Sequence, residues 1–171
     1  GGFQRQNART AFAALREFCK TTISDEEIAS ALFTFPGVER RMSMRFDNGT
    51  FRLIEDYAHH PTELKASLDA LKETNPGNGQ PHRFARLKQY FGEFVEILSQ
   101  QSDLVLIPPV FAAWTDKSEL DSHALAEQIG NKAIALDGDW CEIARKTVEQ
   151  IQRGDLIAVI GAGDVKEIIP P

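Results

Sequence analysis

The length, composition and charge of the chain exclude several classes of protein. Its 171 residues, 42% of them hydrophobic and 26% charged, are typical of one globular domain or of one domain with part of another. The net charge of −6 disfavours a nucleic-acid surface, no apolar run approaches the roughly 20 residues of a membrane helix, and the absence of a signal or transit pattern predicts a cytoplasmic protein.

The first 36 residues are predicted to be helical and to precede the main domain. Apolar residues recur at three- and four-residue steps over residues 7–20, which predicts a helix. Ser24-Asp25-Glu26-Glu27 is a capping box that begins a second, shorter helix. The break at Phe35-Pro36-Gly37 then marks a domain boundary. We therefore expect residues 1–36 to be the tail of an upstream domain and residues 37–171 to form the main domain.

A β-hairpin is predicted next, because Asp47-Asn48-Gly49-Thr50 separates two extended segments and Asn-Gly accepts the positive φ angles of a tight turn. The hairpin joins residues 41–46 to residues 51–55. Two arginines begin the first strand and two carboxylates end the second. Taken alone, Arg40, Arg41, Glu55 and Asp56 predict an ion pair on the surface across the hairpin, which is worth little energy.

The second strand leads into Asp56-Tyr57-Ala58-His59-His60-Pro61, where Pro61 begins a helix that runs to Thr74. Ligands of open α/β proteins bind where strand carboxyl ends meet helix amino ends, so this elbow is a candidate binding site. A solvated loop is the alternative for any one histidine. We predict no metal site, since adjacent histidines rarely point the same way and no third ligand is suitably spaced. Cys19 and Cys141 lack metal-site spacing and are predicted to be free thiols.

Gln80-Pro81-His82-Arg83-Phe84-Ala85-Arg86 opens the next predicted helix. Arg83 and Arg86 share a face near its amino end, where two cations oppose the helix dipole unless an anion lies between them. A solvated basic helix start is the alternative. A parallel sheet also requires a strand between this helix and the previous one, and residues 75–79 supply none. Either that strand was deleted or residues are missing between Gly77 and Gln80, and we favour the second explanation.

The rest of the chain alternates strands and helices. Strands are predicted at residues 103–107, 133–136 and 155–160, and helices at residues 122–129 and after Asp139. Gly161-Ala162-Gly163 lacks a third glycine and follows the last strand, so it indicates a close backbone approach rather than NAD binding. His123 is predicted to be an ordinary surface residue. The alternation predicts a Rossmann-like α/β fold with a mostly parallel sheet and an N-terminal hairpin.

Residues 56–63, together with residues 37–41, 80–83 and 161–165, resemble the signatures of the Mur ligase C-terminal domain in order and spacing. Within that family the resemblance is greatest to the branch that joins L-alanine to UDP-N-acetylmuramate in peptidoglycan precursor synthesis. It implies an ATP- and Mg²⁺-dependent ligase that makes an acyl phosphate for the amine of L-alanine to attack. It also implies that residues 1–36 are the helical tail of the central ATPase domain.

The resemblance assigns roles to two groups of residues. It implies that Tyr57 and His59 face a second group across a cleft and hold the amino-acid carboxylate with it; the second group is His82, Arg83 and Arg86. It also places Arg41 and Asp56 on the ATP side, as a guanidinium for phosphate and a carboxylate for ribose hydroxyls. Asn7 matches a nucleotide-side asparagine weakly and otherwise caps its helix.

One part of such an enzyme is absent from this sequence. No Gly-x-x-x-x-Gly-Lys-Ser/Thr phosphate loop occurs, so we expect the chain alone to hydrolyse no ATP and to need upstream domains of the same protein as partners. Two alternatives remain open. One is the recycling ligase of the same family, which attaches a murein tripeptide, and the other is a noncatalytic binding module with this fold.

Overall fold

The computed structural model describes residues 2–19, 22–74, 87–109 and 121–169. The chain folds as two compact units, Gly1–Glu39 and Arg40–Pro171. Within the described residues, none of the helices combines the length and the apolar character needed to cross a membrane. The strand predicted to be missing after Thr74, and the helix start predicted at Gln80, lie outside the described residues.

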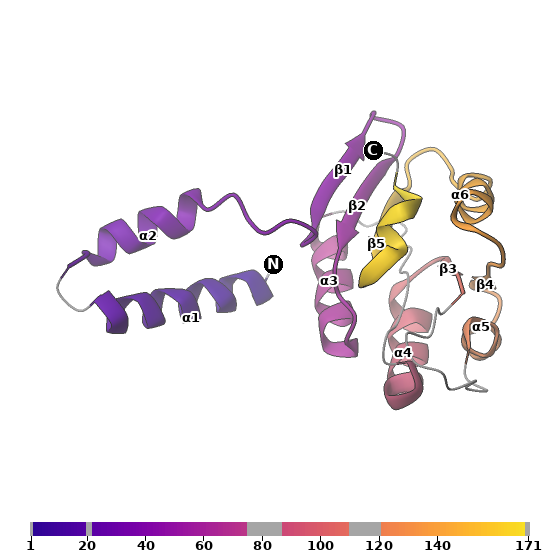
Figure 1. Ribbon diagram of the computed structural model, residues 1–171, viewed down its shortest axis with the longest axis horizontal. Helices are drawn as coiled ribbons and strands as arrows, with labels where there is room; N and C mark the ends of the chain where they lie inside the picture. The colour runs from indigo at the N-terminus through magenta and orange to yellow at the C-terminus, as the bar shows by residue number, and fades with distance from the viewer. Residues whose placement is uncertain (1, 20–21, 75–86, 110–120, 170–171) are drawn as a thin grey trace. The chain divides into compact units, whose positions relative to one another are not determined.

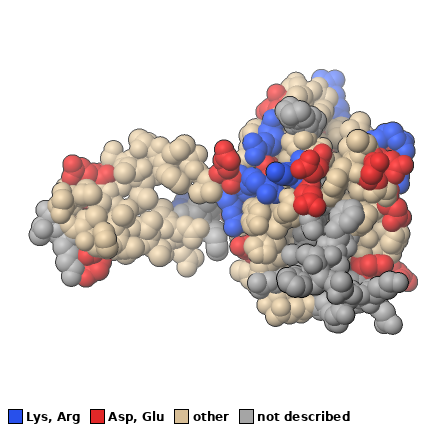
Figure 2. Space-filling model, viewed as in Figure 1, with Lys and Arg blue, Asp and Glu red and all other residues tan. Residues whose placement is uncertain are grey.

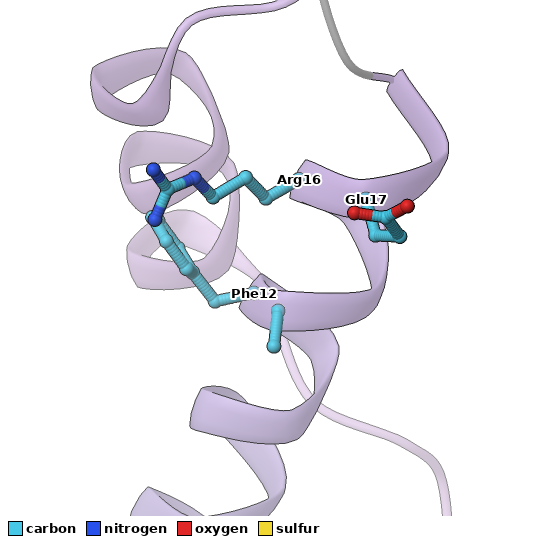
Figure 3. Close-up of a pocket in the computed structure, with 4 residues that line it drawn as sticks. Phe12, Arg16 and Glu17 are labelled. Carbon is cyan, nitrogen blue, oxygen red and sulfur yellow. The ribbon is translucent and has the colours of Figure 1, made fainter.

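The first unit is a pair of helices, α1 (Gly2–Cys19) and α2 (Asp25–Thr34), which pack side by side (Figure 1). The predicted capping box forms, since the Ser24 hydroxyl accepts from the Glu27 amide and the Glu27 carboxylate accepts from the Ser24 amide. Phe18 and Phe33 are 90% and 92% exposed, so this unit buries little of its own apolar surface. A shallow hollow lies along α1, and two of its lining residues, Phe12 and Arg16, point toward α2 (Figure 3).

The described residues of the second unit form two sheets. Strands β1 (Ser43–Asp47), β2 (Arg52–Asp56) and β5 (Leu156–Ile160) form the first in the order β1-β2-β5, and β3 (Val105–Ile107) pairs with β4 (Ala133–Ala135) in the second. The β1–β2 hairpin is antiparallel, whereas β2 and β5, and β3 and β4, run parallel. This arrangement confirms the predicted α/β class with an N-terminal hairpin and otherwise parallel pairing.

The hairpin turn has the predicted geometry, with Gly49 at a φ of +75° and the Asn48 side chain accepting from the amides of Thr50 and Phe51. The ladder is irregular one step away, because the register shifts between Met44 and Phe46. Arg45 is therefore an extra residue on β1, and such a bulge redirects the side chain that it carries.

In the described part of this unit, four α-helices accompany the sheets: α3 (Pro61–Thr74), α4 (Leu87–Gln101), α5 (Ser122–Ile129) and α6 (Trp140–Val148). Helices α3 and α4 pack on each other (Figure 1). One face of α3 is buried, with Leu64, Leu68 and Leu71 at most 3% exposed, and it joins Phe94 and Leu98 of α4 in the main core. All five residues of β5 are buried, as expected of a strand covered on both faces.

One element was not predicted. A 3-10 helix, η1 (Gly163–Ile168), follows the last strand directly, and Gly163 begins it with a φ of +78°. The turn from β5 into η1 lies against the elbow, because the Gly161 amide donates to the Asp56 carbonyl over 2.8 Å. The carboxyl ends of β2 and β5 thus meet beside the start of α3, where the candidate site lies.

Candidate functional site

Asp56, the last residue of β2, is buried and holds two pieces of backbone. Its side chain is 4% exposed, and its two oxygens accept from the Met42 amide over 2.9 Å and from the Ala58 amide over 2.8 Å. The first bond fixes the segment that leads into β1, and the second fixes the elbow. Asp56 therefore joins the start of the hairpin to the elbow, and any further contact would use its remaining lone pairs.

The segment that Asp56 holds has an unusual backbone. Arg40 and Met42 have φ angles of +58° and +52°, a region that residues other than glycine seldom adopt. Such conformations persist where surrounding contacts impose them, and they are often found at functional sites. Arg41 lies between these two residues, so its direction depends on the contacts that hold its neighbours.

The ion pair expected across the hairpin forms, but the expectation that it lies on the surface is wrong. Glu55 is 2% exposed, and its carboxylate lies 2.5 Å from Nε of Arg40 and 2.6 Å from a terminal nitrogen of Arg45. The bulge on β1 supplies the second arginine. Two cations thus compensate one buried carboxylate, as a charge removed from water requires.

Arg41 is held much more loosely than Arg40. Its guanidinium lies 4.0 Å from Asp56 and 3.6 Å from Glu63, and its side chain is 44% exposed. Both distances exceed those of a good charge-assisted hydrogen bond. Figure 2 shows basic and acidic side chains interspersed over the hairpin part of this unit. Because its ion pairs are long, Arg41 is a cation that can leave its present partners for an anion at small cost.

Tyr57 and His59 form the aromatic part of the site. The Tyr57 ring lies 4.9 Å from the guanidinium carbon of Arg40 and 5.7 Å from that of Arg41, within the range of cation–π contacts. The His59 ring meets the Tyr57 ring edge-on, with centroids 5.5 Å apart. The amide of Tyr57 donates to the Arg40 carbonyl over 2.6 Å, so the aromatic group is tied to the arginine segment.

Glu63 completes this group, although we assigned it no role from the sequence. It accepts from the His59 amide over 3.1 Å, lies 3.3 Å from Nδ1 of the same histidine, and faces Arg41. Partial burial raises the pKa of Glu63. Hydrogen bonds from backbone N–H groups and the charges of His59 and Arg41 lower it by more, so the pKa lies below its usual range. The spacing of four between His59 and Glu63 at a helix start was the signal that could have predicted this contact.

His60 has a structural role. Its Nδ1 accepts from the Thr62 amide over 3.2 Å, and its carbonyl accepts the first helical bond of α3, from Leu64. The His60 ring packs edge-on against Tyr90 of α4, with centroids 4.6 Å apart. His60 therefore caps α3 and links it to α4, and among the described residues no three His, Cys, Asp or Glu side chains gather as a metal site would require.

The structure brings four of the predicted site residues together: Arg41, Asp56, Tyr57 and His59. Their proposed partners His82, Arg83 and Arg86 lie outside the described residues. Asn7 is an exposed residue of α1 in the first unit. His123 is exposed as predicted and binds Asp137 over 3.0 Å, which raises its pKa through that hydrogen bond and the negative charge.

Comparison with known proteins identifies the class to which this site belongs. Residues 40–163 match the family domain described as "Mur ligase, glutamate ligase domain". The match covers most of the chain, so the chain belongs to the Mur ligase family, and these residues match its C-terminal domain. The predicted family and fold are both confirmed.

Curated relatives point to one branch of the family. The UDP-N-acetylmuramate–L-alanine ligase of Allorhizobium ampelinum is 34% identical over 95% of this chain and 36% of its own length. The enzyme of that name from Caldicellulosiruptor bescii is 35% identical over 95% of this chain and 37% of its own length. The chain thus spans little more than a third of these relatives.

Solved structures agree on the fold. The UDP-N-acetylmuramate-alanine ligase of Thermotoga maritima superimposes with a TM-score of 0.72 at 24% identity, over 95% of this chain and 36% of that one. A pseudomurein peptide ligase type C from Methanothermus fervidus gives a TM-score of 0.73 at 23% identity, over 99% of this chain and 36% of that one. At these identities the superpositions show a common fold and do not identify a substrate.

Proposed function

We propose that this chain is the C-terminal part of an ATP-dependent ligase that joins L-alanine to UDP-N-acetylmuramate. The observation that carries the proposal is the loosely paired Arg41 beside Tyr57, His59 and Glu63, at the elbow whose sequence matches the family signature. The names of the curated relatives support L-alanine and UDP-N-acetylmuramate as substrates. A reaction on a UDP-linked precursor would place the protein in the cytoplasm.

In the proposed reaction, the muramate carboxylate accepts the γ-phosphoryl group of ATP, and the amine of L-alanine then displaces phosphate from the acyl phosphate. Arg41 would leave Glu63 and bind phosphate oxygens, because a guanidinium forms stronger hydrogen bonds with that anion. ATP and Mg²⁺ would be held mainly by the upstream domain. Asp56 would support the nucleotide side by holding the Arg41 segment, with its remaining lone pairs available to ribose, and Asn7 stays a weaker candidate.

Tyr57 and His59 would form one side of the amino-acid site. An edge-on aromatic pair beside a guanidinium offers an apolar wall for a methyl group and polar edges for a zwitterion. His82, Arg83 and Arg86 are proposed to supply the cations for the carboxylate. Orientation of the amine toward the acyl phosphate can contribute roughly 7–11 kcal/mol to lowering the barrier in ideal cases.

The test uses the protein extended upstream through the phosphate loop. With ATP, Mg²⁺ and UDP-N-acetylmuramate present, phosphate release should depend on L-alanine, and the murein tripeptide should replace it poorly. Preference for the tripeptide would instead identify the recycling ligase. Failure of both acceptors, with no binding of ATP, would identify an inert module and overturn the proposal. The 171-residue chain alone is expected to release no phosphate.

A further inference from the structure

Arg40 contacts two stretches that lie far apart in the sequence, namely β2 with the elbow that follows it, and the turn after β5. Its Nε binds Glu55 at the end of β2, and a terminal nitrogen donates to the carbonyl oxygens of Gly161 and Gly163 over 3.4 and 3.3 Å. Its own carbonyl accepts from the amide of Tyr57. A single residue therefore joins β2, the elbow and the turn between β5 and η1.

These contacts act on a segment whose conformation needs support. The positive φ angles of Arg40 and Met42 are unfavourable for residues with a Cβ, so bonds on each side must stabilise them. Asp56 supplies the bond at Met42, and the side-chain contacts of Arg40 supply the support at the other end. Arg41 projects from between the two supported residues, and its guanidinium lies near the Tyr57 ring.

We propose that Arg40 is a positioning residue that fixes the direction of Arg41 by tying the segment before β1 to Glu55 and to the turn at Gly161 and Gly163. Whether Arg40 fixes the direction of Arg41 can be tested on this chain alone. The consequence that Arg41 then meets phosphate rests on the proposed function. The two claims can therefore fail separately.

Arg45 provides a matched control. It binds the same carboxylate of Glu55, at 2.6 Å, and its side chain is 39% exposed. Arg45 comes from the bulge of β1, and its described contacts include no carbonyl of the Gly161–Gly163 turn. Loss of Arg45 should weaken the pairing of Glu55 without releasing the turn. A purely structural role for Arg40, limited to neutralising Glu55, would make the two arginines equivalent.

The first experiment compares Arg40→Lys with Arg45→Lys in the 171-residue chain by NMR. Both variants keep the charge, but one ammonium group cannot reach the carboxylate and both carbonyl oxygens together. We expect Arg40→Lys to shift the amide signals of Gly161 and Gly163 and to reduce the ring-current shift that Tyr57 imposes on the Arg41 side chain. Arg45→Lys should leave these signals near their original positions. Equal shifts in both variants, or none in either, would overturn the proposal.

A second variant guards against failure of Arg40→Lys to fold. Gly163→Ala alters the turn from the other side, because the φ of +78° at this residue strains a side chain, while the side chains of Arg40 and of its partner Glu55 are both retained. The Arg41 side-chain signal should move as it does in Arg40→Lys. An unchanged Arg41 signal despite a displaced turn would show that the turn does not position this residue.

The functional readout uses the protein extended upstream. Arg40→Lys should raise KM for ATP on the order of tenfold, and Arg45→Lys should change it by less than about twofold, since misplacing a binding group weakens its contacts. Equal KM values for the two variants would contradict a role in presenting Arg41. Absence of any ligase activity in the unmodified extended protein would refute the proposed function, and the NMR comparison would still decide the positioning claim.

Discussion

The pKa of Glu63 depends on several neighbouring groups of the site. Partial burial raises its pKa, and this is outweighed by hydrogen bonds from the His59 and His60 amides and by the charges of His59 and Arg41. We expect a 13C NMR titration to place the Glu63 carboxyl below its usual range. Arg41→Ala removes one of the lowering charges and should move the pKa part of the way back. A Glu63 pKa at or above the usual value in the unmodified chain would contradict this account.

Because folding lowers the pKa of Glu63, the stability of the folded chain depends on pH. The pKa is lower in the folded state than in the unfolded state, so the stabilisation by Glu63 is complete above the unfolded value of about 4.5. It is lost as the pH falls through the folded pKa. Acid therefore weakens the link between the elbow and the first turn of α3, and the effect should be smaller in Arg41→Ala.

The residue types at this site could be predicted, but their partners could not. Residues 56–61 indicated a site because polar and ionisable groups gather where a strand leads into a helix. Glu55, by contrast, was expected on the surface, since no local pattern reveals that the segment before β1 and the bulge on β1 bring two arginines over it. Contacts between residues 40 and 161 depend on chain topology, and sequence periodicity does not report them.

At the scale of elements, α6 offers a comparison between two kinds of surface interaction. Asp139 accepts from the Glu142 amide over 2.9 Å, and Glu142 accepts in return from the Asp139 amide. Asp139→Ala leaves a helix amide without its partner and should lower the free energy of unfolding by about 1 kcal/mol. Urea denaturation of the 171-residue chain measures this change in the free energy of unfolding.

The matched control at the other end of α6 is Glu149→Ala. It removes the exposed ion pair with Arg145, at a spacing of four residues, which is worth about 0.3–0.5 kcal/mol. The Glu149 carboxylate also faces the negative end of the helix dipole, so its loss should cost even less. A larger effect from Glu149→Ala than from Asp139→Ala would show that the cap is not what stabilises α6.

Where the sequence signal for the start of a helix is strong, the first residue of that helix was predicted correctly. Pro61 begins α3, and Asp121, just before α5, caps that helix as its side chain accepts from the Ala124 amide. Predictions from weaker signals were less accurate. Strand β3 begins two residues later than expected. Helix η1 was not predicted, because a glycine turn after a strand has no helical periodicity. The end of β5 was correct, since its five apolar residues stop at Gly161.

On the scale of the whole molecule, the two units differ in how well each buries its apolar residues. The second unit has a core of fully buried residues from α3, α4 and β5, whereas α1 and α2 leave Phe18 and Phe33 almost fully exposed. Leu15, Ile23 and Phe35 of this unit are exposed as well, and extensive exposed apolar surface commonly marks an interface. This supports the proposal that the first unit is the helical tail of an upstream domain.

The central claim is that the elbow of the second unit faces the incoming amino acid. The most direct test follows the ring signals of Tyr57 and His59 by NMR in the protein extended upstream, with UDP-N-acetylmuramate and a non-hydrolysable ATP analogue bound. Titration with L-alanine should shift both sets of signals saturably and leave those of His123, on α5, unchanged. Phosphate release that depends on L-alanine, with Tyr57 and His59 signals that do not move during the titration, would contradict the account.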